Sequence, residues 1–282
     1  MTAFDRRLTP ARPDLAAEFL RGEVEAAAFV AGQRLRVTAA SAALRRAPDM
    51  AAGLDTEALH GEAVTVYETR DGWAWGQLDA DGYVGYMRAD ALGEAPAPTH
   101  RVSVPRTFAY PGANIKLPAV MALPLNAAVC VAETRGEFAV TPHGLCLWAA
   151  HLAPLGEAAP DFVAVAETLL HVPYLWGGKT SIGLDCSGLV QNALSAAGIS
   201  SPRDTDMQER GLGKAVAFDA SLDGLQRGDL VFWKGHVGIL RDAGTLLHAS
   251  GHQMMVASEP LDVARERIAA KSYGAVTALR RP

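Results

Sequence analysis

A glycine-rich stretch that leads into a cysteine constrains this chain more than any other feature. It runs from Tyr174 to Gln191 and reads YLWGGKTSIGLDCSGLVQ. Its glycines and small hydroxyl side chains predict tight turns and a close approach of the backbone to other parts of the fold. After Cys186 the apolar residues take up helical spacing, so we expect a helix that begins near this cysteine.

The expected place of Cys186 at a helix N-terminus predicts a reactive thiol. Unpaired N–H groups and the positive end of the helix dipole favour negative charge there, which stabilises a thiolate and makes a better nucleophile. A buried structural cysteine that packs like a small apolar side chain is the alternative. The residues around Cys186 in the fold have to decide between the two.

Composition narrows the class of protein. The chain has 282 residues, 49% of them hydrophobic and 20% charged, which is typical of a globular protein with two or three domains. A net charge of −5 without a basic run predicts no nucleic-acid partner. The chain has no apolar window near the ~18 residues of a membrane span, and its N-terminus lacks the apolar core of a secretory signal. We therefore expect a cytoplasmic protein, unless a leader has been removed.

Three cysteines stand at positions 130, 146 and 186, an odd number whose spacing matches neither a disulfide framework nor a zinc site. Reduced thiols are the simpler interpretation. A disulfide between Cys130 and Cys146 is the alternative. No metal or other cofactor is expected.

The first half of the chain predicts an arm and two small barrels. Residues 1–34 form an N-terminal arm, in which Asp14 to about Arg21 is expected to be an amphipathic helix that packs on a domain. Residues 35–95 contain short alternating runs separated by tight turns, which predicts one barrel. Residues 96–156 repeat this arrangement in degenerate form and predict a second.

Residues 157–282 predict a domain of another kind. An amphipathic helix over 162–170 is followed by the glycine-rich stretch, the helix from Cys186, a polar loop over 200–206 and several strands. A last helix near 263–270 and a strand near 273–279 complete it. Helices first and an antiparallel sheet afterwards indicate an α+β fold.

Two histidines can supply the base that a cysteine nucleophile needs. His236 and His248 lie twelve residues apart on two predicted strands joined by a turn, so the strands are expected to pair. If the two side chains share a face, they come close enough for one imidazole to orient the other. Cys186, at the start of its helix, would then meet His236. A zinc site built from the same three residues is the alternative, although the close ligand pair usual in such sites is lacking.

These motifs resemble a known family. LDCSGLV at 184–190, preceded by YLWGG at 174–178 and followed by GHVGI at 235–239 and then His248, is similar to the NlpC family of papain-like bacterial peptidases. Both barrels resemble bacterial SH3-like domains, and DGYVGY at 81–86 carries that likeness in the first. The resemblance implies an α+β papain-like peptidase domain after two SH3-like β-barrels. The combination implies a γ-D-glutamyl-L-diamino acid endopeptidase acting on murein peptides.

The resemblance also implies roles for individual residues. Cys186 would be the nucleophile and an oxyanion donor through its backbone N–H, His236 the general base and acid, and His248 its orienting partner. Tyr174 and Asp185, with Glu62 and either Tyr86 or Tyr83 from the first barrel, would surround the free amine of the substrate's L-Ala. Ser187, Arg203, Asp204 and Thr205 would hold the α-carboxylate of γ-D-Glu, and Trp176 would form a pocket wall.

The sequence therefore predicts a cytoplasmic cysteine peptidase that releases L-Ala-γ-D-Glu from a murein tripeptide or tetrapeptide. One alternative is a periplasmic or secreted hydrolase of intact peptidoglycan. A second is a non-catalytic module that binds wall peptides. A third, acyltransferase or amidase chemistry on lipids, predicts apolar helices near the site in place of the polar loop at Arg203. The identity of the diamino acid and the oligomeric state stay open.

Overall fold

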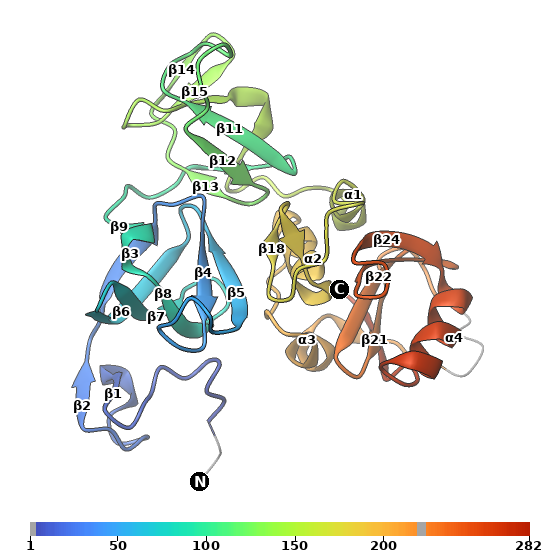
Figure 1. The fold of residues 1–282 in the computed structure, drawn as a ribbon. Helices are drawn as coiled ribbons and strands as arrows, with labels where there is room; N and C mark the ends of the chain where they lie inside the picture. The colour runs from blue at the N-terminus through green and yellow to red at the C-terminus, as the bar shows by residue number, and fades with distance from the viewer. Residues whose placement is uncertain (1–3, 219–223) are drawn as a thin grey trace. The chain divides into compact units, whose positions relative to one another are not determined.

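A computed structural model of the chain describes residues 4–218 and 224–282. It divides into a barrel unit, Met1–Leu155, and a C-terminal unit, Gly156–Pro282 (Figure 1). The first three residues of the predicted arm, and residues 219–223 of the predicted peptidase domain, lie outside the described residues.

The first barrel is one antiparallel sheet of seven strands with the order β5-β4-β8-β7-β6-β3-β9. Its elements are β3 (Gln33–Val37), β4 (Ser41–Arg45), β5 (Leu54–Leu59), β6 (Ala63–Arg70), β7 (Trp73–Leu78), β8 (Val84–Arg88), η2 (Ala89–Ala91) and β9 (Leu92–Gly93). Alternate residues such as Val64 and Val66 point into the core, as the period of two predicts. Asp71 and Gly72 both have positive φ, which gives the tight hairpin turn between β6 and β7.

The second barrel repeats the strand order of the first. Its elements are β10 (His100–Val102), β11 (Arg106–Tyr110), β12 (Met121–Pro124), β13 (Ala128–Val129), β14 (Glu133–Arg135), β15 (Phe138–Val140), β16 (Cys146–Trp148), η3 (Ala149–His151) and β17 (Leu152–Pro154). The order β12-β11-β16-β15-β14 matches β5-β4-β8-β7-β6, and β10 pairs with β13 and β17 as β3 pairs with β6 and β9. The predicted tandem of two β-barrels is confirmed.

The two barrels meet through their backbones. The amide of Ala128 donates to the carbonyl of His60 at 2.7 Å. A Cβ placed on Gly61, where φ is +79°, would lie 2.1 Å from the Ala128 carbonyl oxygen. Glycine is therefore required at position 61, both for its backbone conformation and for this approach.

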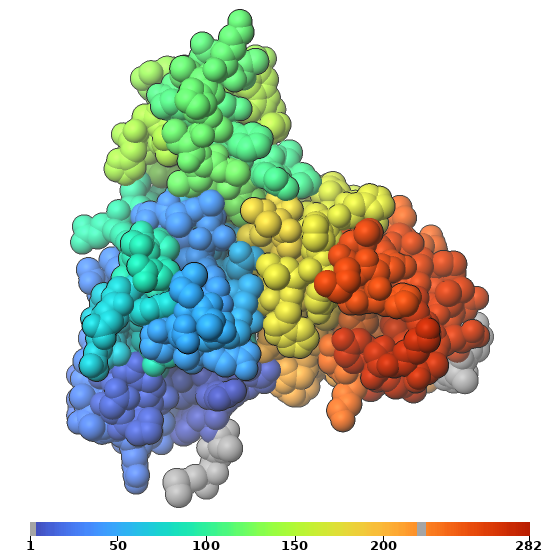
Figure 2. Space-filling view, in the orientation of Figure 1, coloured from blue at the N-terminus to red at the C-terminus, as the bar shows by residue number. Residues whose placement is uncertain are grey.

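The arm packs on the first barrel as predicted, but the helix expected from Asp14 to Arg21 is wrong. The segment forms β1 (Leu15–Ala17), a single turn of 3₁₀ helix η1 (Glu18–Leu20) and β2 (Ala28–Val30), with β1 and β2 parallel. All three residues of β1 are buried, which an extended segment covered on both sides allows and a short surface helix does not. Figure 2 shows the dark blue atoms of the arm directly against the barrel.

Arg12 fastens the arm to an aromatic face of the barrel. Its guanidinium lies over the Trp75 ring at 4.3 Å from the centroid. It also donates to the Tyr86 hydroxyl at 2.9 Å and to the Glu68 carboxylate at 2.8 Å. Pro13 favours an extended backbone at Arg12, which suits this reach across the surface.

Replacing Arg12 by alanine is therefore expected to loosen the arm. The lost cation–π contact and partly exposed ion pair amount to roughly 1–2 kcal/mol of local stability. Amide hydrogen exchange in β1, where Ala17 donates to the Pro10 carbonyl, should speed up accordingly. Arg34→Ala is the matched control, because Arg34 makes only an exposed pair with Asp79 among its described ion pairs. Equal exchange in both variants would contradict the anchoring role.

The C-terminal unit is an antiparallel sheet with helices on both faces. Its helices are α1 (Phe162–Glu167), α2 (Cys186–Ala196), α3 (Thr205–Gly211) and α4 (Leu261–Lys271). Its strands are β18 (Lys179–Thr180), β19 (Gly183–Leu184), β20 (Lys214–Ala215), β21 (Leu230–Trp233), β22 (His236–Asp242), β23 (Thr245–Ser250), β24 (Met255–Pro260) and β25 (Ala278–Arg281). The main sheet has the order β20-β25-β21-β22-β23-β24.

Figure 1 shows α2 and α4 on opposite sides of this sheet. With both faces covered, consecutive residues of β21 are fully buried. The α+β prediction is confirmed, and the helix begins at Cys186 as expected. The helix α3 was missed, because its seven residues are mostly polar and read as a loop. Within the described ranges, none of the helices combines the length and hydropathy needed to cross a bilayer.

Candidate functional site

Asp185 organises the segment that holds Cys186. It is the N-cap of α2, and its carboxylate accepts from the amides of Gly188 at 2.7 Å and Gly177 at 2.9 Å. Arg203 donates to both oxygens of the same carboxylate, at 2.9 and 2.8 Å. One buried carboxylate thus caps the helix and closes the glycine-rich loop, and it fixes the residue immediately before the cysteine.

Three glycines allow the loop to pack this tightly. A Cβ on Gly188, in the first turn of α2, would lie 2.4 Å from the carbonyl oxygen of Gly178. A Cβ on Gly178 would lie 2.4 Å from the Gly183 carbonyl oxygen, and one on Gly183 would lie 2.4 Å from the Leu175 Cβ. The predicted close approach of the backbone is confirmed. The glycines pack against other residues of the same stretch, 174–191.

Cys186 is the first residue of α2 and is 7% exposed. Its sulfur lies 3.7 Å from the Thr205 hydroxyl. Burial and, after it, the Asp185 carboxylate raise the pKa of the thiol to about 11, although contacts with the Thr205 hydroxyl and the Val237 amide lower it in part. Desolvation of the sulfur therefore opposes the stabilisation of a thiolate that the helix N-terminus provides.

His236 and His248 are joined as predicted, on the paired strands β22 and β23. Nε2 of His236 lies 2.7 Å from Nδ1 of His248, and the two rings meet edge to face. Gly238 leaves room for this contact, because a Cβ there would lie only 3.2 Å from the His248 Cβ. Both rings are at least 96% buried, and burial lowers the pKa of His236.

Two further side chains complete the surroundings of His236 and were not predicted. Glu259 on β24 accepts from Nε2 of His248 at 2.7 Å. Tyr273, after α4, stacks on the His236 ring with centroids 5.3 Å apart and planes 9° apart. Glu259 could have been found from an acidic residue inside a buried strand next to a histidine strand. Tyr273 follows a helix end in irregular backbone and gives no periodic signal.

The other predicted residues of this unit lie around the same loop. Ser187 is 5% exposed and accepts from Arg203 at 2.9 Å. Arg203 is 1% exposed and also donates to the Gly178 carbonyl, so its guanidinium holds the loop together from inside. Asp204 is the N-cap residue of α3, and Thr205 begins that helix.

Tyr174 and Trp176 present more surface than these residues. Tyr174 is half-buried, and its pKa is raised by burial and by the nearby Cys186 and Asp185. Trp176 is 66% exposed, so its indole is not packed beneath the loop. Both therefore keep part of their side-chain surface accessible.

The site residues predicted in the first barrel differ in how deeply they are buried. Tyr83 is 5% exposed and belongs to the barrel core. Glu62 accepts from the Leu59 amide at 3.1 Å within a turn. Tyr86 lines a pocket of about 680 Å³, together with Trp75 and Glu68.

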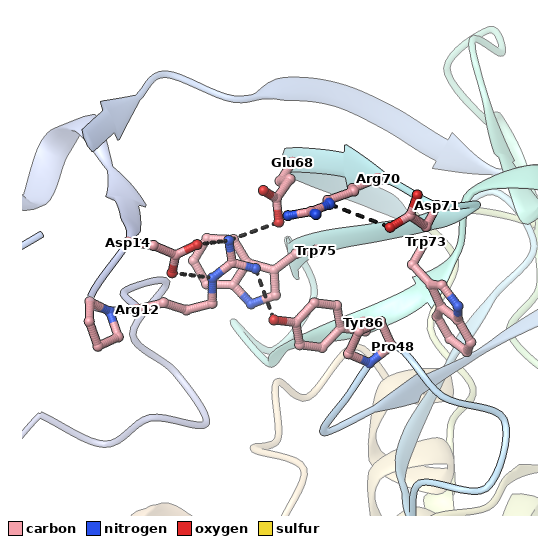
Figure 3. A pocket seen from close by; sticks show the side chains of 10 residues that line it. Arg12, Asp14, Pro48, Glu68, Arg70, Asp71, Trp73, Trp75 and Tyr86 are labelled. Carbon is pink, nitrogen blue, oxygen red and sulfur yellow. Dashed lines mark hydrogen bonds and ion pairs between the residues drawn. The ribbon is translucent and has the colours of Figure 1, made fainter. Parts of the chain in front are cut away.

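Figure 3 shows how Arg12 enters this pocket between Tyr86, Trp75 and Glu68. The pocket carries Glu68 and not Glu62 beside Tyr86. Glu62 lies in the turn before β6, whereas Glu68 lies within that strand, directly after a register shift that follows Val66. The sequence gives no sign of that bulge.

Comparisons with known proteins agree with this geometry. The NlpC/P60 family matches residues 171–272, and the bacterial dipeptidyl-peptidase Sh3 domain matches residues 44–92. The chain is 30% identical over 228 residues to a gamma-D-glutamyl-L-lysine dipeptidyl-peptidase of Bacillus subtilis, which covers 70% of this chain and 72% of that protein. The chain belongs to the NlpC/P60 family. It is therefore a cysteine peptidase with an SH3-like barrel ahead of its NlpC/P60 domain.

Two other relatives extend the NlpC/P60 comparison. A protein of Bacillus cereus with the same name is 26% identical over 242 residues, covering 74% of this chain and 71% of that one. A crystal structure of an NlpC/P60 family protein from Bacillus cereus superposes with a TM-score of 0.73 at 22% identity, covering 88% of this chain and 99% of that chain. At this identity the structural comparison shows a shared fold, in residues of both units, and nothing further.

The cysteines fit the NlpC/P60 assignment. Cys130, Cys146 and Cys186 are all free, so the alternative disulfide is not formed. Across residues 4–218 and 224–282, no three His, Cys, Asp or Glu side chains are grouped so as to hold a metal ion. His236 and His248 instead use ring nitrogens on each other and on Glu259.

Proposed function

We propose that this NlpC/P60 peptidase is a γ-D-glutamyl-L-diamino acid endopeptidase of cytoplasmic murein recycling. It would release L-Ala-γ-D-Glu from tripeptides and tetrapeptides that carry a free N-terminal L-Ala. The observation that carries the proposal is the buried Cys186, His236 and His248 site in a chain 30% identical to a gamma-D-glutamyl-L-lysine dipeptidyl-peptidase. The Thr205 hydroxyl beside Cys186 and the polar segment around it support a peptide substrate more than a lipid.

In this proposal the reaction starts from the Cys186 thiol and the His236 imidazole. As the sulfur of Cys186 attacks the γ-carbonyl carbon of D-Glu, His236 takes the thiol proton and becomes an imidazolium. The Cys186 amide, one of those without a partner inside α2, would donate to the oxyanion. His236 then protonates the departing α-amine of the diamino acid, and water hydrolyses the thioester.

The remaining residues divide into contact and support roles in this proposal. Tyr174, Trp176 and Thr205 would contact the substrate. Arg203 acts through Asp185 and Ser187, since its guanidinium is bonded to both. Recognition of the L-Ala amine by the first barrel stays a prediction of the family resemblance, with Tyr86 as its test position and Glu68 added beside Glu62.

A comparison of free and blocked peptides tests this function. The enzyme should release lysine or diaminopimelate from L-Ala-γ-D-Glu-L-Lys or L-Ala-γ-D-Glu-diaminopimelate, and the N-acetylated peptides should react at least about 100-fold more slowly, because a site that pairs a buried amine loses that pairing. Mass spectrometry of the products gives both rates. Equal rates would remove the amine requirement, and faster release from intact peptidoglycan would favour a wall hydrolase. Binding without turnover of any peptide would identify a binding module.

A further inference from the structure

We propose that Glu259, held by Arg267, is a positioning residue that sets the tautomers of His248 and His236, so that His236 faces Cys186 with an unprotonated Nδ1. This role concerns the same hydrolysis and rests on the proposed function only where an activity assay is used. It adds a carboxylate and a guanidinium behind the two histidines.

The geometry is a continuous chain of short hydrogen bonds from β22 to α4. Nε2 of His236 meets Nδ1 of His248 at 2.7 Å, and Nε2 of His248 meets Oε1 of Glu259 at 2.7 Å. Arg267 donates to the same Oε1 at 2.7 Å, and through its other Nη to Oε2. The strand register explains the meeting, because His248 pairs with Ala257, two residues before Glu259 on the same face.

Burial limits which arrangements of donors and acceptors these hydrogen bonds can adopt. His248 is 1% exposed, Glu259 is 9% exposed and the Arg267 side chain is 15% exposed. A donor or acceptor left unpaired here would lose its hydration without compensation. Each ring nitrogen is therefore obliged to match the partner that faces it.

The ionisation of the Glu259 carboxylate decides which ring nitrogens of His248 and His236 carry protons. Burial opposes ionisation of Glu259, but the hydrogen bonds from His248 and Arg267 outweigh it and lower its pKa to about 2. An ionised carboxylate only accepts hydrogen bonds, so Nε2 of His248 carries a proton. Nδ1 of a neutral His248 is then an acceptor, and Nε2 of His236 donates to it. The lone pair of His236 is left on Nδ1.

Arg267 supplies a counter-charge to the carboxylate behind His248. A buried carboxylate without a counter-charge would favour a second proton on the neighbouring imidazole. His248 would then donate from both nitrogens, and His236 would have to accept at Nε2 and carry its proton on Nδ1. In that tautomer His236 has no lone pair for the thiol proton. The guanidinium balances the charge of Glu259 and so preserves the basic form of His236.

The first test reads the protons directly and needs no substrate. In protein labelled with ¹⁵N-histidine, long-range ¹H–¹⁵N spectra at neutral pH should show both rings neutral, with the proton on Nε2 and a bare Nδ1. The His236→Gln and His248→Gln variants assign the signals. A proton on Nδ1 of His236, or a doubly protonated His248, would overturn the proposal even if every variant at position 259 failed to fold.

The second test compares Glu259, which accepts a hydrogen bond from His248, with Glu266, which is exposed. Glu259→Gln removes the charge behind His248, whereas Glu266→Gln makes the same change at an exposed position of α4. Glu259→Gln should lower kcat roughly 100-fold with little change in KM, because an amide can present either its oxygen or its NH2 group to Nε2 of His248 and so no longer fixes one tautomer. It should also slow alkylation of Cys186 by iodoacetamide and shift the ring ¹⁵N signals. Glu266→Gln should change none of these.

The outcomes separate this proposal from the proposed function. If no murein peptide is cleaved but the tautomers and alkylation rates behave as stated, the substrate is wrong and the positioning role stands. If Glu259→Gln keeps wild-type kcat, alkylation and ring signals while the peptides are cleaved, the positioning role is wrong and the substrate stands.

Discussion

Cys186→Ser should lower kcat on the tripeptide by on the order of 10⁴-fold or more. The hydroxyl fits the space of the thiol but gives up its proton far less readily to an imidazole whose own pKa is lowered by burial. The variant should still bind the peptide, because Asp185 and the loop remain in place. Stopped or continuous assays of lysine release give kcat, and calorimetry gives the affinity for the uncleaved peptide.

Cys130→Ser is the control for this loss, since it makes the same exchange at a free cysteine of the second barrel. It should leave kcat within about twofold, as expected of a substitution away from the reacting atoms. A Cys186→Ser variant that kept a tenth of the activity would show that the sulfur is not the nucleophile.

Arg203→Met should destabilise the C-terminal unit by about 3–5 kcal/mol, because it leaves one member of a buried ion pair without its partner. Asp185 would keep the amides of Gly177 and Gly188 but lose both bonds from the guanidinium. Amide exchange in α2 and the urea midpoint of this unit would report the change.

Arg210→Met provides the comparison, because Arg210 pairs with Asp206 in the exposed i,i+4 geometry of α3. Its effect should stay within about 0.5 kcal/mol. The double change of Asp185→Asn with Arg203→Met should cost less than the sum of the single changes, since neither partner is then left as a lone buried charge. Additive effects would show that the two side chains are not coupled.

The parts of the fold and site that could be predicted depend on residues that are close together in the sequence. The helix start at Cys186 follows from a capping aspartate, a small residue and an apolar run. The meeting of His236 and His248 follows from two strands of matching alternation and a turn of the right length. The barrels follow from turn residues such as Asp71 and Gly72, whose backbone conformation few other pairs adopt as readily.

The parts that were missed depend on which segments meet in three dimensions. Glu259 and Arg267 lie outside the matched motifs, and only the register of β24 and the packing of α4 bring them to His248. The family resemblance implies contact between Arg203 and the substrate, but its burial against Asp185 is not visible in the sequence. The arm was predicted helical from apolar spacing, but the surface it covers favours extended chain.

The hydrogen bonds of Asp185 make the stability of this domain and its catalytic activity depend on the same side chain. In many enzymes stability and activity are traded against each other as mutations accumulate. Here the carboxylate next to the nucleophile also caps the helix, closes the loop and neutralises a buried guanidinium. A lineage under selection for turnover thereby retains local stability without separate selection for it. A lineage released from that selection would lose the fold of the loop together with the reaction.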